Sequence, residues 1–383
     1  MPSTPSSSAC LRPGASDMPS TDQQEPRSLA SQPTPAPTHP PLYALGFSRR
    51  KQALLRSFLG GQPVRFVTCE GDVPEAAELV VWGAAELATP ARPGSVLRVE
   101  DGFLRSVGLG AAFARPSSWI VDRCGIHYDA SRPSELEHLL QETECSADLL
   151  ARAATLRQRI VAAGATKYNL GGTPWRRARA ATRVCLAVGQ VESDASLRLG
   201  SPFVRSDAEL VARVRKANPG AYIVYKPHPD VCAGLREPGR ADRHLRQHCD
   251  EVVEMTDIST LFDAVDEVHV MTSLAGFEAL LRGRRVVTHG QPFYAGWGLT
   301  VDAFPPARRA RQLTLDTLVA CTLILYPRYV DALGVLTTPE TVLDELMARR
   351  AQDTLSARSA SVAGRLVGQL LRALVWTREP SRR

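Results

Sequence analysis

Two short polar clusters in this chain have residue types that suit group transfer. The first is Glu100-Asp101-Gly102, and the second is Lys226-Pro227-His228-Pro229. A carboxylate can act as a nucleophile or a general base, whereas a lysine and a histidine can bind an anion or stabilise a leaving group. Each cluster follows an apolar run that is typical of a buried strand. Together they predict transfer of a group from a phosphate-activated donor.

Both clusters also have a structural explanation. Glu100 and Asp101 could simply cap a helix, and acidic pairs followed by glycine are common. Arg105 and Ser106 could hold an anionic group of a substrate such as a carboxylate, or they could be surface residues. The second cluster is more specific, because two prolines fix the backbone on either side of His228.

A third cluster is Thr272-Ser273, at the junction between an apolar strand and a helix. Its hydroxyls and the free N–H groups of the first helical turn can bind a phosphate. Gly276 and Glu278 follow in the same helix, where Glu278 could reach the hydroxyls of a ribose. An ordinary N-cap would use the same serine or threonine, and the two explanations are compatible.

Two further segments contain candidate donor-binding residues. The run 290–300 has three glycines and three aromatic residues, a composition that predicts a loop closing over a flat ligand through Tyr294 and Trp297. The run 189–196 places Gln190, Glu192 and Ser196 just after another apolar strand, where they would face the same cleft.

Strands that alternate with helices predict an α/β fold with parallel, helix-covered sheets. In such folds ligands bind beyond the carboxyl ends of the strands. We expect a disordered Pro/Ser-rich tail over 1–40, an α/β domain with the acidic cluster over 41–165, a second α/β domain over 166–335 and C-terminal helices over 336–383. Strands are expected at 64–67, 79–82, 95–99, 184–188, 221–225, 267–271 and 285–288, and helices at 51–59, 134–141, 149–163, 206–216, 260–265, 274–282, 314–325 and 339–351.

The segment 361–378 has one apolar stripe and arginines on another face, which predicts a basic amphipathic helix. Such a helix could pack on the protein or on a partner, or it could lie on a membrane surface.

The bulk composition is that of a soluble globular protein. The chain has 383 residues and a formal charge of +6. This charge suits anionic ligands or anionic surfaces and does not indicate which of them the protein binds.

The 8 cysteines of the chain are scattered, with neither a C-x-x-C motif nor zinc spacing. No apolar run approaches the ~18 residues of a membrane span, and the N-terminus has no signal-peptide pattern. These features predict a cytoplasmic protein without a structural zinc site. The transferase-like motifs, and not the charge, lead us to expect no nucleic-acid partner.

Six ordered runs in this chain resemble the bacterial capsule polysaccharide β-Kdo transferases, the KpsC/LipB family. These runs are 100–106, 189–196, 225–230, 272–283, 292–300 and 325–331, and the similarity covers most of 42–350. The resemblance implies a GT-B-like fold with two Rossmann-like domains and an interdomain cleft. It also implies CMP-Kdo as donor, retention of configuration and a lysophosphatidylglycerol- or Kdo-primed glycolipid acceptor at the inner membrane face.

The resemblance also implies roles for individual residues. Asp101 would be the nucleophile, with Glu100 beside it, and His228 would stabilise the departing CMP with help from Lys226. Ser273 and its helix would bind the phosphate. No cofactor or metal is required, because cationic side chains and helix N-termini can neutralise one phosphate. The general base is not implied; His127 and Glu192 are candidates.

The chain departs from the best-known members in having one copy of each motif instead of two. It could therefore form one linkage, work with a partner enzyme, or use a different acceptor. Two alternatives stay open: a transferase for another CMP-sugar such as CMP-sialic acid, and a non-catalytic capsule-assembly protein. The intact Glu100, Asp101, Lys226 and His228 argue against the second.

Overall fold

The computed structural model describes residues 40–88, 96–110, 112–177, 182–236 and 245–353. Its first sheet has seven strands in the order β13-β12-β5-β4-β3-β1-β2. Strands β2, β1, β3 and β4 are parallel, whereas β5, β12 and β13 continue the sheet in antiparallel pairs. The strands are β1 (Leu42–Leu45), β2 (Val64–Val67), β3 (Leu79–Trp82), β4 (Val96–Asp101), β5 (Ser118–Asp122), β12 (Pro327–Val330) and β13 (Leu336–Thr337).

The second sheet has six strands in the order β11-β10-β9-β6-β7-β8, and every pair is parallel. Its central strands β6 and β9 are buried along their whole length, as expected where helices cover both faces, and β6 is entirely apolar. The strands are β6 (Val184–Val188), β7 (Tyr222–Lys226), β8 (Glu251–Val252), β9 (Glu267–Val270), β10 (Arg285–Thr288) and β11 (Val301–Asp302).

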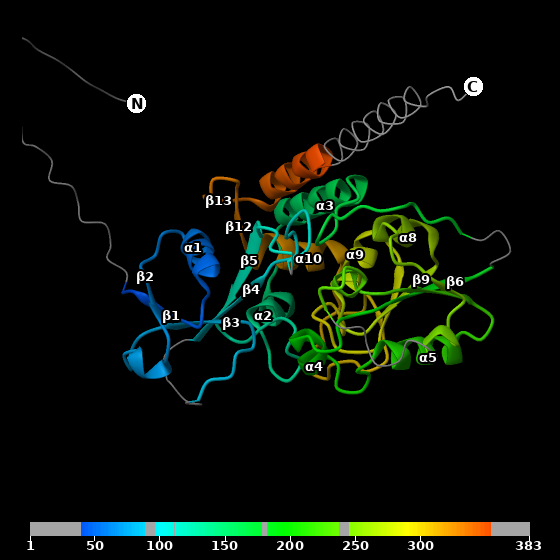
Figure 1. Cartoon of the computed structure of the whole chain (residues 1–383), viewed down its shortest axis with the longest axis horizontal. Helices are drawn as coiled ribbons and strands as arrows, with labels where there is room; N and C mark the ends of the chain where they lie inside the picture. Colours follow the sequence, from blue (N-terminus) through cyan, green and yellow to red (C-terminus); the bar gives the residue numbers. More distant parts are fainter. Residues whose placement is uncertain (1–39, 89–95, 111, 178–181, 237–244, 354–383) are drawn as a thin grey trace, which may run out of the picture. The chain divides into compact units, whose positions relative to one another are not determined.

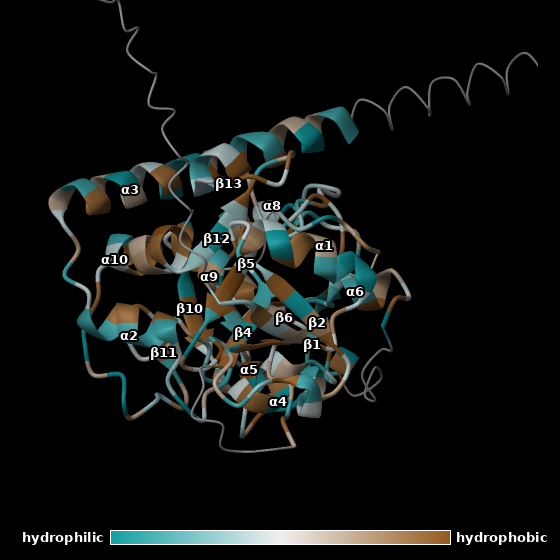
Figure 2. Cartoon of the chain, turned by 90° about the vertical axis from the view of Figure 1, so that its left-hand side faces the viewer, coloured by the Kyte–Doolittle hydropathy of each residue, from teal (hydrophilic) through white to brown (hydrophobic). Residues whose placement is uncertain are grey.

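Helices connect the strands, and several begin at a serine whose hydroxyl accepts a hydrogen bond from the first turn. Ser134, Ser146 and Ser206 do so for α2, α3 and α5. Hydrophilic and hydrophobic residues alternate along α3, as its exposed and packed faces require (Figure 2). The helices are α1 (Arg49–Phe58), α2 (Glu135–Glu142), α3 (Ala147–Ala162), α4 (Ala195–Gly200), α5 (Asp207–Ala217), α6 (Pro229–Cys232), α8 (Ile258–Ala264), α9 (Leu274–Leu281) and α10 (Leu315–Val319), with a π-helix at Ala320–Leu325 and a 3-10 turn at Glu70–Asp72.

These elements confirm the α/β fold with two sheets, and each expected strand and helix up to residue 351 is present within a few residues. The sequence pattern predicts none of the strands β1, β5, β8, β11, β12 and β13. The predicted tail over 1–40 and the basic helix over 361–378 lie outside the described residues, apart from residue 40.

The end of the described chain returns to the first sheet, which differs from the expected domain boundary at residue 335. Strand β12 pairs with β5, and the helix over 339–353 lies along α3 (Figure 1). Two ion pairs, Arg152–Glu340 and Arg159–Asp344, connect that helix to α3. The first α/β half is therefore assembled from two separated stretches of sequence.

One apolar core spans both halves. Phe103 and Ile120 of the first half share a buried cluster with Leu186 and Val268 of the second. The Phe103 ring lies 5.0 Å from the ring of Phe293 between centroids. This shared core fixes the ends of the two sheets against each other.

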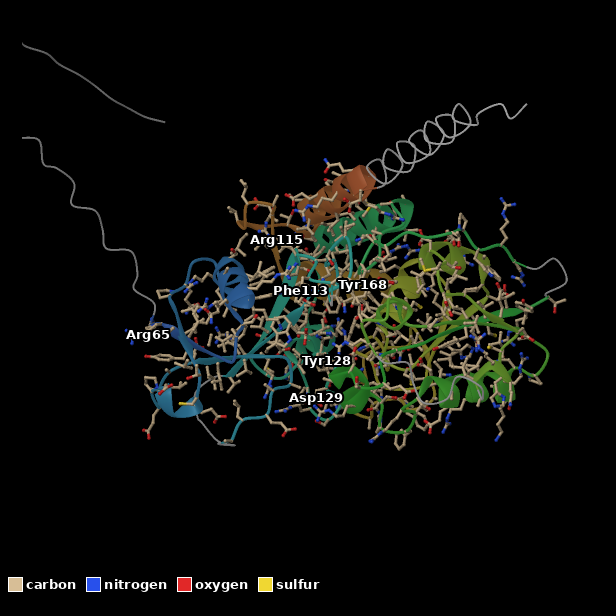
Figure 3. The ribbon with its side chains drawn as sticks, viewed as in Figure 1. Arg65, Phe113, Arg115, Tyr128, Asp129 and Tyr168 are labelled. Atoms are coloured by element: carbon tan, nitrogen blue, oxygen red, sulfur yellow. The ribbon has the colours of Figure 1, made fainter. Side chains whose placement is uncertain are left out.

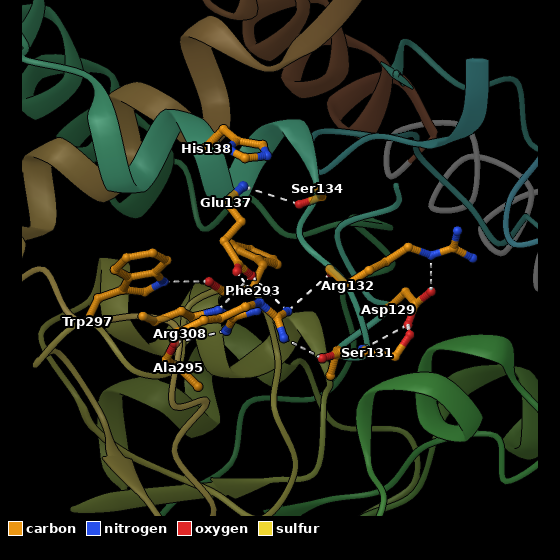
Figure 4. A network of polar contacts seen from close by, with 12 residues as sticks. Asp129, Ser131, Arg132, Ser134, Glu137, His138, Phe293, Ala295, Trp297 and Arg308 are labelled. Atoms are coloured by element: carbon orange, nitrogen blue, oxygen red, sulfur yellow. Dashed lines mark hydrogen bonds and ion pairs between the residues drawn. The ribbon is translucent and has the colours of Figure 1, made fainter. Parts of the chain in front are cut away.

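A buried ion network adds a polar connection between the halves (Figure 4). Glu137 of α2 forms ion pairs with Arg308 and Arg309 of the second half, and Arg309 Nε lies 2.9 Å from Glu137 Oε2. The Arg309 side chain is only 2% exposed. Its Nη1 also donates to the carbonyl of Ala295 at 2.9 Å, so its charge is fully compensated only while Glu137 is present.

We predict that Glu137→Ala lowers the free energy of unfolding by about 3–5 kcal/mol, because it leaves the buried guanidinium of Arg309 unpaired. Chemical denaturation measures this change. Glu144→Ala is the matched control: Glu144 pairs with Arg311 but is 91% exposed, so its loss should cost under about 1 kcal/mol. Equal effects of the two variants would contradict a structural role for the buried network.

Candidate active site

A cavity of about 1320 Å³ lies where the carboxyl ends of strands from both sheets meet. Its lining includes the end of β4, the loops after β6, β7 and β9, and residues 166–172 between the halves. Phe113, Tyr128 and Tyr168 lie in this middle region (Figure 3). The cavity is thus located where parallel α/β sheets bind ligands.

Asp101 is the last residue of β4, and its carboxylate is anchored by one arginine. Arg105 Nε lies 2.6 Å from Asp101 Oδ2, while Arg105 Nη1 donates to Ser106 Oγ at 2.9 Å. Gly102 must be a glycine, since a Cβ there would lie 2.7 Å from the Cβ of Ser118. The backbone after Asp101 can therefore lie directly against Ser118 of β5, and Arg105 follows four residues after Asp101.

Glu100 also lines the cavity, but it is held differently. Its Oε1 accepts from the Asp101 N–H at 2.9 Å, and its Oε2 accepts from the Tyr128 hydroxyl at 3.2 Å. Burial, followed by the charge of Asp101, raises the pKa of Glu100 to about 7. The two adjacent carboxyl groups therefore differ: near neutral pH Glu100 can hold or release a proton beside Asp101.

His228 lines the opposite wall as the N-cap of α6. Its Nδ1 accepts from the Asp230 N–H at 3.1 Å, so the ring proton lies on Nε2. Burial, followed by the charge of Lys167, lowers the pKa of His228 to about 4. His228 is therefore a neutral hydrogen-bond donor near neutral pH, and it can stabilise a leaving group without a charge of its own.

The ammonium group of Lys226 forms a hydrogen bond within the protein. Its Nζ donates to the carbonyl of Glu254 at 2.6 Å, and its side chain is nearly buried. Burial lowers the pKa of Lys226. It lines the cavity next to His228, yet its main visible role is to hold the loop after β8.

The predicted phosphate site is assembled around the N-terminus of α9. Ser273 Oγ caps this helix by accepting from the Ala275 N–H at 3.3 Å. Gln190 is bound to the neighbouring residue, accepting from the Thr272 N–H at 2.8 Å and donating to Thr272 Oγ1 at 2.9 Å. Gln190, Ser196, Thr272 and Ser273 all line the cavity, as predicted for donor-binding residues.

Glu278 lines the cavity, but one of its carboxylate oxygens already accepts a hydrogen bond within the protein. Its Oε1 accepts from the Lys167 N–H at 2.6 Å, and burial raises its pKa to about 7. A hydrogen bond to a ribose would have to use its other oxygen.

Five predicted site residues do not line the cavity. The rings of Tyr294 and Trp297 are fully buried; Tyr294 donates to the Ser273 carbonyl, and Trp297 Nε1 donates to the Phe293 carbonyl at 2.8 Å. The expected contact of this loop with a flat ligand is therefore wrong for these two rings, which form the core under α9. Gly276 gives Tyr294 the space that a Cβ would fill.

The other two residues have supporting positions. Ser106 is 1% exposed, accepts from Arg105 and donates to the Gly108 carbonyl at 2.8 Å, so it orients Arg105 instead of touching a substrate. Glu192 accepts from the Asp207 N–H at 3.3 Å at the start of α5. Glu192 is not among the residues that line the cavity, which makes it the less suitable of the two base candidates.

The sequence analysis missed several cavity residues, above all Lys167 and Arg236. Lys167 belongs to the polar segment between the two halves. Only this position in the sequence could have indicated that it lines the cavity. His127 does line the cavity, but burial lowers its pKa to about 3, so it is a weak base.

Among the described residues, one group has ligand atoms close enough for a metal ion: Cys185, Glu267 and His269, at the core of the second sheet. None of the three lines the cavity. Glu267 already pairs with Arg183 at 3.0 Å and Arg285 at 2.6 Å. Two guanidinium groups on the only carboxylate make this group unsuited to a divalent cation.

A search of the helices in the described ranges finds none whose length and hydropathy would let it span a bilayer.

Sequence comparison relates the chain to capsule proteins. The family model described as "Capsule polysaccharide biosynthesis protein" matches residues 84–170 and 148–329. The chain is 40% identical over 300 residues to the capsule polysaccharide modification protein LipA of Neisseria meningitidis serogroup A, covering 76% of this chain and 43% of LipA. It is 42% identical over 299 residues to the lipopolysaccharide-processing protein LpsZ of Rhizobium meliloti, covering 75% of this chain and 67% of LpsZ. The chain thus spans less than half the length of LipA.

Two solved structures have the same fold. The β-Kdo 2,7 transferase of Thermosulfurimonas dismutans KpsC superposes with a TM-score of 0.70 at 34% identity, covering 81% of this chain and 100% of that one. The β-Kdo 2,4 transferase of the same KpsC gives a TM-score of 0.71 at 34% identity, covering 81% and 99%. The expected GT-B-like α/β architecture is confirmed by these matches.

We predict that Glu100→Gln changes how folding stability depends on pH. The pKa of Glu100 is about 7 in the folded chain, against an ordinary value of 4.5 for a glutamate. The unfolded chain therefore releases this proton first, and the wild type loses about 2–3 kcal/mol of stability as pH rises between those values. Gln cannot titrate, so denaturation at about pH 5 and about pH 8 should show the variant gaining that amount relative to wild type. A pH-independent difference would contradict the raised pKa.

Proposed function

The chain belongs to the capsule polysaccharide biosynthesis family, and we propose that it is a retaining glycosyltransferase that moves β-Kdo from CMP-Kdo to a lipid-linked or saccharide acceptor. One observation carries this proposal: Asp101, anchored by Arg105, shares a cavity with His228 and the N-terminus of α9. The match to the whole length of two β-Kdo transferase chains supports the choice of donor.

In the proposed first step Asp101 attacks the anomeric carbon of the donor. Arg105 holds Oδ2, which leaves Oδ1 to form an ester bond with the sugar. The bond between the anomeric carbon and the phosphate oxygen breaks, and its electron pair leaves with CMP. The Nε2–H of neutral His228 can donate to that oxygen, which stabilises the charge that develops there.

In the proposed second step an acceptor hydroxyl attacks the same carbon. The new glycosidic bond forms as the ester bond breaks, so Asp101 recovers its carboxylate and two inversions give retention. Glu100 is the residue we assign to take the hydroxyl proton, because its pKa of about 7 suits a general base near neutral pH. It replaces His127 and Glu192 in this role.

The donor phosphate would be bound without a metal in this proposal. The free N–H groups at the start of α9 give a positive local potential. Arg236, which also lines the cavity, can add a full positive charge, and CMP-sugars have a single phosphate to neutralise.

The entrance of the cavity supports an amphipathic acceptor. Phe113, Leu170 and Met255 line it with exposed fractions of 72%, 50% and 75%, and Arg49 and Arg50 are beside them in the lining. Exposed apolar side chains next to cations suit a glycolipid with an anionic headgroup. Such an acceptor would place the reaction at a membrane surface.

We expect Asp101→Ala to lower CMP release from CMP-Kdo by about 10³-fold or more while the protein stays folded, because the nucleophile is lost. Glu86→Ala, at an 89% exposed carboxylate, is the control and should keep wild-type turnover. Mass spectrometry of wild type with donor alone should find a Kdo adduct on Asp101. An adduct on another residue, or turnover with CMP-sialic acid and none with CMP-Kdo, would refute the nucleophile or the donor respectively.

We also expect the double variant Phe113→Ala, Met255→Ala to raise the KM for a Kdo-primed lipid acceptor by about 10-fold or more, since two exposed apolar side chains lose their contact with the lipid. The KM for CMP-Kdo should stay the same. A water-soluble saccharide acceptor is the matched comparison, and an equal rise in its KM would show that these side chains do not bind lipid.

A further inference from the structure

One cation in the cavity is not yet assigned a role. Lys167 lies in the segment between the two halves, lines the cavity and is half-buried. Among the described residues no carboxylate forms an ion pair with it, whereas the nearby Arg105 is paired with Asp101. Its Nζ lies 5.2 Å from the centroid of the Tyr168 ring.

The backbone of Lys167 is fixed from both halves. Its N–H donates to Glu278 Oε1 at 2.6 Å in the second half. Its carbonyl accepts from the Ser106 N–H at 3.2 Å in the first half. Asn169 strengthens this arrangement, since its Nδ2 donates to the Ser106 carbonyl at 3.0 Å. The backbone of Lys167 is thus fixed from both halves, and within the described ranges its ammonium group forms no ion pair, which leaves it available to a ligand in the cavity.

Charged groups surround Lys167 on both walls. Burial is the largest influence and lowers the pKa of Lys167, but the carboxylates of Asp101 and Glu100 and the neighbouring Tyr168 side chain together raise it. The positive charge of Lys167 in turn contributes to lowering the pKa values of His127 and His228. The ammonium group therefore stays protonated in the cavity that Asp101 and His228 also line.

The chemistry of the proposed donor identifies the ligand group. In a 2-keto sugar acid the anomeric carbon carries both the phosphate and a carboxylate. The phosphate must leave on the side opposite Asp101, toward His228 and α9, so the carboxylate stays near Asp101. Two other cations are close to Asp101: Arg105 is bound to Asp101 and Ser106, and Lys51 Nζ lies 3.1 Å from the Trp82 ring centroid.

We propose that Lys167 binds the sugar carboxylate of the donor and thereby selects 2-keto sugar acids over neutral sugars. This inference rests on the proposed function, and it reassigns the carboxylate from Arg105 and Ser106, which orient the nucleophile. Lys167 is thus a specificity-determining residue supplied by the segment between the halves.

The test compares CMP-Kdo with CMP, which has the phosphate but no sugar carboxylate. Both are titrated calorimetrically into Asp101→Asn, which prevents turnover, with and without Lys167→Met. We expect Lys167→Met to weaken CMP-Kdo binding by about 10- to 100-fold and CMP binding by less than about 3-fold. Lys167→Arg should restore part of the loss, and Lys51→Met, which removes a cation from the same cavity, should leave the ratio of the two affinities unchanged.

Equal losses for CMP and CMP-Kdo would overturn the inference, since Lys167 would then bind the phosphate. No loss for either ligand in a folded Lys167→Met would overturn it too. If the Asp101→Asn chain binds CMP-sialic acid and not CMP-Kdo, the proposed donor is wrong. In that case the affinities for CMP-sialic acid and CMP are compared with and without Lys167→Met. Because the sugar of CMP-sialic acid is also a 2-keto acid, this comparison supports or overturns the role of Lys167 independently of the donor.

Discussion

The site depends on one electrostatic constraint: two carboxyl groups, Glu100 and Asp101, are adjacent at the end of a strand inside a cavity. Two charges at that separation repel strongly in a medium of low polarity. The structure resolves the repulsion by giving them different partners. Arg105 neutralises Asp101 at 2.6 Å, while Glu100 accepts hydrogen bonds from a backbone N–H and a tyrosine hydroxyl. Burial and the neighbouring charge of Asp101 outweigh the backbone hydrogen bond and favour the protonated form of Glu100.

That division requires the surrounding backbone to be held in place. Gly102 lets the backbone after Asp101 lie against β5, because Ser118 occupies the space where a side chain would otherwise lie. The strand that supplies Ser118, β5, is in turn paired with β12 from near the end of the described chain. The shared core and the Glu137 network then fix the second half against this wall. The charge state of one glutamate is thus coupled to contacts made more than two hundred residues away along the chain.

Much of this site could be predicted from sequence because it follows strand ends. Asp101, His228 and Ser273 each come directly after an apolar run, and parallel strands bring such ends to one edge. Side-chain direction could not be predicted in the same way. The loop around Trp297 has the composition of a binding loop, but its rings point into the core. Lys167 has no motif around it, and only the crossing of the chain between the halves gives it a place in the cavity. Strand β5 was missed because its pairing is antiparallel, which no alternation of strands and helices indicates.

The two walls of the cavity differ in when their side chains become positively charged. Those near Asp101 are charged before a ligand binds, whereas His228 can gain a charge when a phosphate binds. On the His228 wall, Lys226 is bound to a carbonyl and His228 is neutral while the cavity is empty. A phosphate bound there would oppose the burial that lowers the pKa of His228 and draw a proton toward the ring. On the Asp101 wall, Arg105 and Lys167 are charged before any ligand binds. A donor with a carboxylate and a phosphate on one carbon would therefore be oriented first by the permanent charges near the nucleophile. The positive charge of the His228 wall would then increase as the bond between the sugar and the phosphate weakens. Stabilisation of a leaving group requires this order of events.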